Sequence, residues 1–123
     1  MNQQKRIFVT GTNTDVGKTL VTACLVDQFQ QAGNSVVAMK PIAAGCELID
    51  GQLFNADAQL LRQIMNKKLP YPVVNPIALK LPIAPHIASE AENRKLSVES
   101  LQIQCDFNQH DSDYLIAEGA GGW

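Results

Sequence analysis

Residues 6–19 read Arg6-Ile7-Phe8-Val9-Thr10-Gly11-Thr12-Asn13-Thr14-Asp15-Val16-Gly17-Lys18-Thr19, and this stretch decides the fold. Residues 6–10 are mostly β-branched or aromatic and stop at a glycine, which predicts a buried strand that runs into a tight loop. In residues 18–32 apolar side chains recur every three or four positions, and a Gly-Asn pair follows, which predicts an amphipathic helix. Residues 35–39 form another apolar run. This strand–helix–strand order predicts a right-handed parallel crossover and an α/β fold.

The loop that joins the first strand to the helix carries groups that bind phosphate. Glycines let backbone N–H groups turn toward an anion, and the start of a helix adds partial positive charge. The ammonium of Lys18 can reach terminal phosphates, and the hydroxyl of Thr19 can bind Mg²⁺. The usual pattern G-x-x-x-x-G-K-[ST] needs glycine at position 12, whereas this chain has Thr12 and places Gly11 one residue earlier. We therefore interpret residues 11–19 as a variant phosphate loop for ATP with Mg²⁺.

Charged residues stand where the later strands of the predicted sheet end. Lys40 follows the second strand, and Glu118 stands at the carboxyl end of a further strand predicted at residues 113–117. Ligands of open α/β folds bind at this carboxyl edge, where an acidic residue commonly holds the nucleotide's Mg²⁺. The alternative for Lys40 is an ordinary solvated lysine. Asp57 opens a helix predicted at residues 56–65, where a carboxylate also stabilises the helix dipole, so a metal ligand and a cap stay open for it.

The rest of the chain has weaker patterns. Residues 42–54 contain two glycines and little periodicity, so we expect a loop. Five of the six prolines fall between positions 67 and 86, which predicts a wandering connection with at most short strand fragments. Ser97 is a candidate N-cap for a helix that runs to Phe107. A chain of 123 residues without a linker is expected to form a single domain, residues 1–123.

Composition excludes several classes of protein. The net charge is −2, the pI is about 5.6, and no basic stripe is present, so we expect no nucleic-acid partner. No apolar run has the length of a membrane span or a signal segment, which favours the cytoplasm. The three cysteines are far apart and lack metal-ligand spacing; Cys24 and Cys105 lie within helical patterns and are expected to be buried. A terminal Trp123 straight after a glycine-rich turn suggests a chain truncated at its C-terminus.

The motifs together resemble one family. They are Phe8-Val9-Thr10-Gly11-Thr12, Asp15-Val16-Gly17-Lys18-Thr19, Met39-Lys40-Pro41, Asn55-Ala56-Asp57, Asn75-Pro76, Pro85-His86 and Glu118-Gly119-Ala120-Gly121-Gly122-Trp123. In this order they closely resemble the N-terminal part of the dethiobiotin synthetases, phosphate-loop ligases of biotin biosynthesis. The resemblance implies a parallel-sheet nucleoside-triphosphatase fold and a homodimer. It also implies that 7,8-diaminononanoate and CO₂ form a carbamate, which ATP phosphorylates before the second amine closes a ureido ring.

The resemblance also implies roles for individual residues. Lys18 and Lys40 would be catalytic and would stabilise the transferring phosphoryl group and the carbamate. The implied Mg²⁺ ligands are Thr19, Asp57 and Glu118. The implied nucleotide-binding residues are Gly11, Thr12, Asn13, Thr14, Asp15, Val16, Gly17, Lys18, Thr19 and Glu118. One departure is Ala44, where many members carry a serine whose hydroxyl could bond the substrate.

Other functions fit the same loop. One alternative is a related phosphate-loop ligase that forms an amide on a different small acid or amine. Another is a nucleotide-switched regulatory ATPase, although such switches typically carry a second lysine near the start of the loop, where this chain has Asn13. A third is an inactive piece of a longer protein. We expect residues 1–123 alone to bind nucleotide weakly at best and not to complete the synthesis.

Overall fold

The centre of the fold is a parallel sheet that joins distant parts of the chain. A computed structural model describes residues 3–12, 17–83, 85–93 and 96–121, and in this part three strands pair in the order β1-β7-β2. Their bounds are Lys5–Val9 for β1, Tyr114–Glu118 for β7 and Val36–Met39 for β2. Both pairings are parallel, with Val9 opposite Glu118 and Met39 opposite Ala117. The α/β prediction with a parallel sheet is therefore confirmed.

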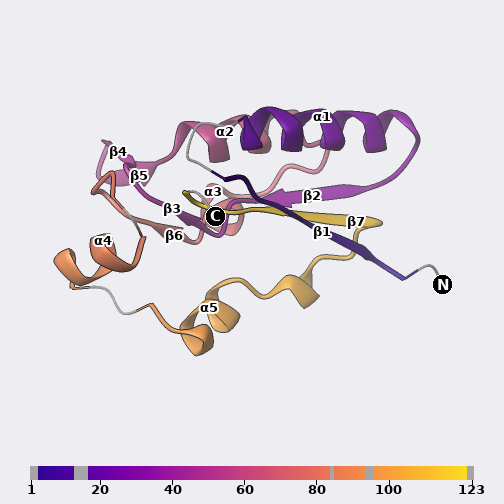
Figure 1. Cartoon of the computed structure of the whole chain (residues 1–123). Helices are drawn as coiled ribbons and strands as arrows, with labels where there is room; N and C mark the ends of the chain where they lie inside the picture. The colour runs from indigo at the N-terminus through magenta and orange to yellow at the C-terminus, as the bar shows by residue number, and fades with distance from the viewer. Residues whose placement is uncertain (1–2, 13–16, 84, 94–95, 122–123) are drawn as a thin grey trace.

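Helices lie on both sides of this sheet (Figure 1). The long helices α1 (Lys18–Gln31) and α2 (Ala56–Ile64) lie together on one side, and α5 (Val98–Gln104) lies on the other. Shorter elements are α3 (Tyr71–Val74), α4 (Pro85–Ala91) and a 3-10 turn at Phe107–Gln109. Among the described residues, no helix combines the length and apolar character that crossing a bilayer requires.

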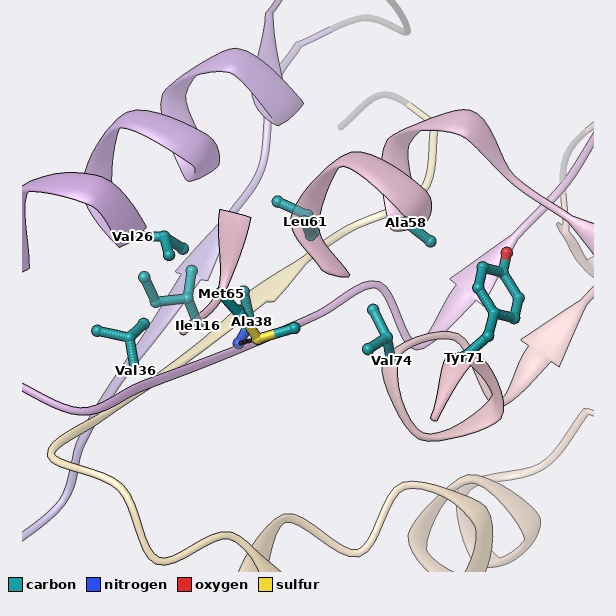
Figure 2. Packing of buried hydrophobic residues seen from close by; sticks show 9 residues of the cluster. All are labelled: Val26, Val36, Ala38, Ala58, Leu61, Met65, Tyr71, Val74 and Ile116. Carbon is teal, nitrogen blue, oxygen red and sulfur yellow. Dashed lines mark hydrogen bonds between the residues drawn. The ribbon is translucent and has the colours of Figure 1, made fainter. Parts of the chain in front are cut away.

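The main core lies between α1, α2 and the sheet, as Figure 2 shows. Its buried members are Val26, Val36, Ala38, Ala58, Leu61, Met65, Tyr71, Val74 and Ile116. Met65 follows α2, and its sulfur accepts a hydrogen bond of 3.1 Å from the backbone N–H of Ala38 in β2. This contact ties the end of α2 to the central sheet. The opposite end of α2 is thereby directed toward the carboxyl edge of the strands.

Two segments differ from the sequence-based expectation. Residues 42–54 are not a plain loop, because they contain β3 (Ile42–Ala43), β4 (Glu47–Ile49) and β5 (Gln52–Phe54). The antiparallel β4–β5 hairpin turns at Asp50 and Gly51, both with positive φ, which is typical of tight hairpins. The proline-rich connection holds one short strand, β6 (Ile77–Ala78), which pairs with β3 in parallel, but it also holds α3. Elements this short give no periodic signal.

Replacing a buried leucine of α2 should cost much more stability than replacing its neighbour. Leu61 is 0% exposed in the main core, whereas the adjacent Leu60 is 40% exposed. We expect Leu61→Ala to lower the free energy of unfolding by about 2–4 kcal/mol, because it removes buried methyl groups and leaves a cavity. Leu60→Ala should change it by less than about 1 kcal/mol. Urea unfolding of both variants makes the comparison, and equal losses would contradict the packing described above.

Candidate functional site

The phosphate loop meets α1 at a glycine in a left-handed conformation. Gly17 has φ 84°, which L side chains rarely adopt, and it occupies the N-cap position of α1 without a side-chain cap hydrogen bond. The first N–H groups of a helix have no partner within the helix and attract anions. This geometry leaves the start of α1 suited to phosphate, as the glycine in the sequence pattern predicted.

The lysine of the loop is directed across the sheet edge. Lys18 is buried at the first position of α1, and its ammonium donates a hydrogen bond to the backbone carbonyl of Gly121. Gly121 lies in the turn after β7 and has φ 70°. The turn after the central strand therefore lies against the loop lysine. A phosphate oxygen that approached Lys18 would compete with this carbonyl.

A cluster of opposite charges lies beside Lys18. The ammonium of Lys40 is 3.0 Å from Asp57 Oδ2 and 3.5 Å from Glu118 Oε1. The hydroxyl of Thr19 donates a hydrogen bond of 2.6 Å to the same Oε1. Burying an ionised carboxylate such as Glu118 is costly unless charges and hydrogen bonds compensate, and Lys40 and Thr19 supply both. Lys40 is buried and paired, so the alternative of a solvated lysine is wrong.

The helix that carries Asp57 is capped by another residue. The side chain of Asn55 accepts a hydrogen bond of 3.0 Å from the N–H of Ala58, which satisfies the start of α2. Asp57 instead directs its carboxylate toward Lys40 and is 47% exposed. Because Asn55 supplies the cap, the carboxylate of Asp57 is free of that role and faces the site.

These groups line one cavity of about 300 Å³ at the carboxyl edge of the sheet. Its lining consists of Gly17, Lys18, Thr19, Leu20, Lys40, Asp57, Glu118 and Gly121. Leu20 and Gly121 had no assigned role from the sequence, although a glycine-rich turn after a strand was a usable signal for Gly121. Gly11 and Thr12 are described but do not line the cavity. Asn13, Thr14, Asp15 and Val16 lie outside the described residues.

The donor set fits a magnesium ion. Glu118 is 1% exposed, and its Oε2 has no hydrogen-bond partner among the residues that the structure describes. Thr19, Asp57 and Glu118 offer only oxygen donors, which hard cations prefer. Within the described ranges no group of three or more His, Cys, Asp or Glu side chains could hold a metal. Mg²⁺ commonly uses one or two carboxylates together with substrate phosphates and water, so two carboxylates and a hydroxyl are sufficient.

The site combines a strand, a glycine loop, a helix and an acidic residue at a strand end. This combination defines a phosphate-loop nucleotide-binding domain of the α/β class. Comparison with known proteins agrees: a family model described as "AAA domain" matches residues 5–123, and the chain belongs to this family. The predicted fold class is thus confirmed, and the assignment of residues 11–19 as its phosphate-binding loop stays a prediction.

Individual relatives are more specific. The chain is 44% identical over 117 residues to the ATP-dependent dethiobiotin synthetase BioD of Marinobacter nauticus, with 94% of this chain and 50% of the relative covered. It is 42% identical to the protein of the same name from Cellvibrio japonicus, with 98% and 53% covered. For that of Legionella pneumophila the identity is 46%, with 96% and 53% covered. The chain spans about half the length of these relatives, and the resemblance to dethiobiotin synthetases is confirmed.

Proposed function

We propose that this chain provides the phosphate-binding and metal-binding part of an ATP-dependent dethiobiotin synthetase. The observation that carries the proposal is the meeting of two lysines and two carboxylates, Lys18, Lys40, Asp57 and Glu118, in one cavity beside the phosphate loop. Identities of 44% and 42% to relatives with this name, over nearly the whole chain, support the choice of substrate.

The proposed reaction places two anions side by side. One amine of 7,8-diaminononanoate adds to CO₂ and forms a carbamate. A carbamate oxygen then takes the γ-phosphoryl group of ATP and releases ADP. The second amine attacks the carbon of this mixed anhydride, closes the ureido ring and expels phosphate. An anionic carbamate beside a triphosphate requires concentrated positive charge at the point of transfer.

The side chains of the cavity suit this requirement. Lys18 would exchange the carbonyl of Gly121 for an oxygen of the terminal phosphates, and Lys40 would face the carbamate and the transferring phosphoryl group. Thr19, Asp57 and Glu118 would hold Mg²⁺, which supplies Lewis-acid charge neutralisation when bound. The remaining loop residues would donate backbone N–H groups to the phosphates. A cytoplasmic homodimer is part of the same proposal, and light scattering tests the dimer.

A chimera tests the function directly. This chain replaces the segment it matches in the Marinobacter nauticus synthetase, and the product is followed by mass spectrometry with MgATP, bicarbonate and 7,8-diaminononanoate. We expect dethiobiotin, and ATP hydrolysis that depends on both other substrates. A related ligase would instead turn over ATP only with a different amine or acid. A regulatory ATPase would hydrolyse ATP at the same rate without either substrate.

Lys40→Ala should separate nucleotide binding from product formation. The ammonium of Lys40 lies among the carboxylates rather than at the start of α1, so its loss should change the affinity for MgATP by less than about threefold. In the chimera, kcat should fall by at least about 100-fold because transition-state charge is no longer stabilised. The exposed Lys80 offers a matched control, Lys80→Ala, with normal turnover. Normal turnover by Lys40→Ala would end this assignment.

A further inference from the structure

Two buried polar side chains lie behind the site and do not line its cavity. Tyr71 belongs to α3 and Asn75 follows it, and both are at most 5% exposed. Leaving a buried hydroxyl or amide without partners is costly, so such groups persist only where their hydrogen bonds are made. The partners of these two side chains lead to the residues of the site.

Asn75 fixes the backbone at Lys40. Its Nδ2 donates hydrogen bonds of 2.9 Å to the carbonyl of Lys40 and 3.1 Å to the carbonyl of Ile77. Its Oδ1 accepts a hydrogen bond of 2.9 Å from the hydroxyl of Tyr71. Both amide hydrogens and the amide oxygen are thus used, and this donor–acceptor pattern determines the orientation of the amide. The backbone N–H of Lys40 is held as well, by the carbonyl of Val74 at 2.9 Å.

Tyr71 fixes the start of α2. Its hydroxyl accepts a hydrogen bond of 2.6 Å from the backbone N–H of Asn55, which is the N-cap of that helix. In Figure 2 the oxygen of Tyr71 is the end of the side chain nearest Ala58, in the first turn of α2. The ring packs edge-on against Phe54 at 4.7 Å between centroids. Burial raises the pKa of Tyr71, so its hydroxyl keeps the proton that it donates to Asn75 at neutral and mildly alkaline pH.

These contacts close a ring through the site. From the carbonyl of Lys40 the hydrogen bonds run through Asn75 and Tyr71 to Asn55, and Asp57 stands two residues further along. The carboxylate of Asp57 then returns to the ammonium of Lys40 at 3.0 Å. Lys40 follows β2, whereas Asp57 belongs to α2, and residues 42–54 separate the two elements in the sequence. The ring therefore connects the end of β2 to the start of α2, in addition to the packing of Ala58 in the main core.

We propose that Asn75 and Tyr71 are positioning residues that hold Lys40 and Asp57 in register at the metal and phosphate site. The proposal rests on the proposed function, since it gives these residues a role toward MgATP. Asparagine suits position 75 because two carbonyl oxygens face it and need two N–H donors. Aspartate has the same shape but would place an acceptor against both carbonyls. Groups that orient metal-site side chains typically change metal affinity by about 10- to 100-fold when removed.

The test uses the whole chain and the affinity for MnATP, read from the water-proton relaxation of Mn²⁺. Asn75→Ala and Asn75→Asp should weaken MnATP binding by about tenfold or more, and Tyr71→Phe by about threefold to tenfold. The matched control is Ser112→Ala, which removes another buried hydroxyl, bonded at 2.8 Å to the carbonyl of Tyr114 at the opposite end of β7. It should leave the affinity within about twofold. In an Asp57→Asn background, Asn75→Ala should add little further loss, because both act through the same carboxylate.

Different outcomes overturn different claims. Unchanged MnATP affinity in Asn75→Ala and Tyr71→Phe, with wild-type binding intact, would refute the positioning role and leave the proposed function standing. Equal losses of MnATP affinity in Ser112→Ala, or fully additive losses in the Asp57→Asn background, would mean that the substitutions only destabilise the fold in general. Either result would also refute the positioning role. Absence of MnATP binding by the wild-type chain would overturn the proposed function and this inference with it. Should Asn75→Ala fail to fold, Tyr71→Phe, which removes one oxygen atom, decides the question.

Discussion

In the chimera, Lys18→Ala should reduce the affinity for MgATP by at least about 100-fold. The buried ammonium of Lys18 lies at the start of α1 and lines the cavity, where hydrogen bonds from a charged donor contribute about 1.5–3 kcal/mol each. Alanine is the strongest helix former, so the substitution should leave α1 itself intact. Isothermal titration calorimetry with MgATP measures the loss, and circular dichroism verifies the helix.

A control must separate this effect from the loss of one positive charge. Lys80 is exposed and does not line the cavity, and Lys80→Ala should keep the wild-type affinity. Equal affinity of Lys18→Ala and wild type for MgATP, in a folded protein, would remove residues 11–19 as the phosphate site. Equal losses in both lysine variants would point to nonspecific attraction of a polyanion instead.

Glu118→Gln should weaken the metal dependence of nucleotide binding more than any other single carboxylate change. Glu118 is 1% exposed at the end of the central strand and presents an unpartnered Oε2, whereas the side chain of Asp57 is 47% exposed. A neutral amide keeps the shape but removes the charge that a divalent cation needs. We expect the Mg²⁺ concentration at half-saturation, with ATP present, to rise by about 30-fold or more, and by about tenfold for Asp57→Asn.

Glu47→Gln gives the matched control, because Glu47 is exposed in β4 and does not line the cavity. Its Mg²⁺ titration should overlay that of the wild type. A wild-type titration curve for Glu118→Gln would mean that the buried carboxylate serves only to neutralise Lys40. In that case Thr19 and Asp57 would remain as candidate ligands among the described residues that line the cavity.

The local part of the fold was predictable because its signals are local. Residues 6–19 combine a strand pattern, a glycine stop and a helix start, and β1 and α1 form where these signals predicted. The prediction that the first strand is buried was wrong, because β1 stands at the edge of the described three-stranded sheet and Phe8 is 64% exposed. The charged residues at strand ends were predictable for a similar reason, since the carboxyl ends of parallel strands share one edge. Lys40 and Glu118 do meet there, at 3.5 Å.

Long-range placement was less predictable. The sequence pattern does not show that β7 lies between β1 and β2, because these contacts are distant along the chain: Lys5 pairs with Tyr114 in one case and Val36 with Tyr114 in the other. The expectation that Cys24 is buried was wrong. Cys24 is exposed in α1, together with Leu20 and Val21, whereas Thr22 is buried. The spacing of apolar residues shows that a helix has an apolar face, but it does not show which face of the helix packs against the sheet. Cys105, in contrast, is buried as expected.

The supporting ring behind the site illustrates the same limit. Asn75 stands in a proline-rich stretch without periodicity, and Tyr71 opens a helix of four residues that no spacing rule detects. Their role depends on which carbonyl and N–H groups the fold brings to them. The sequence alone also left Asp57 between cap and ligand. The structure shows that Asn55 is the cap, because it accepts the hydrogen bond from the N–H of Ala58, and the ligand role of Asp57 stays a prediction.

The most direct test of the central claim is paramagnetic relaxation by MnATP in the amide NMR spectrum of this chain. The method detects millimolar affinities and therefore tolerates weak binding. We expect selective broadening of the amides of Thr19, Asp57 and Glu118, none for residues of α5 on the other side of the sheet, and loss of the effect in Lys18→Ala. Broadening that is absent, uniform, or unchanged in Lys18→Ala would contradict a MgATP site at the phosphate loop.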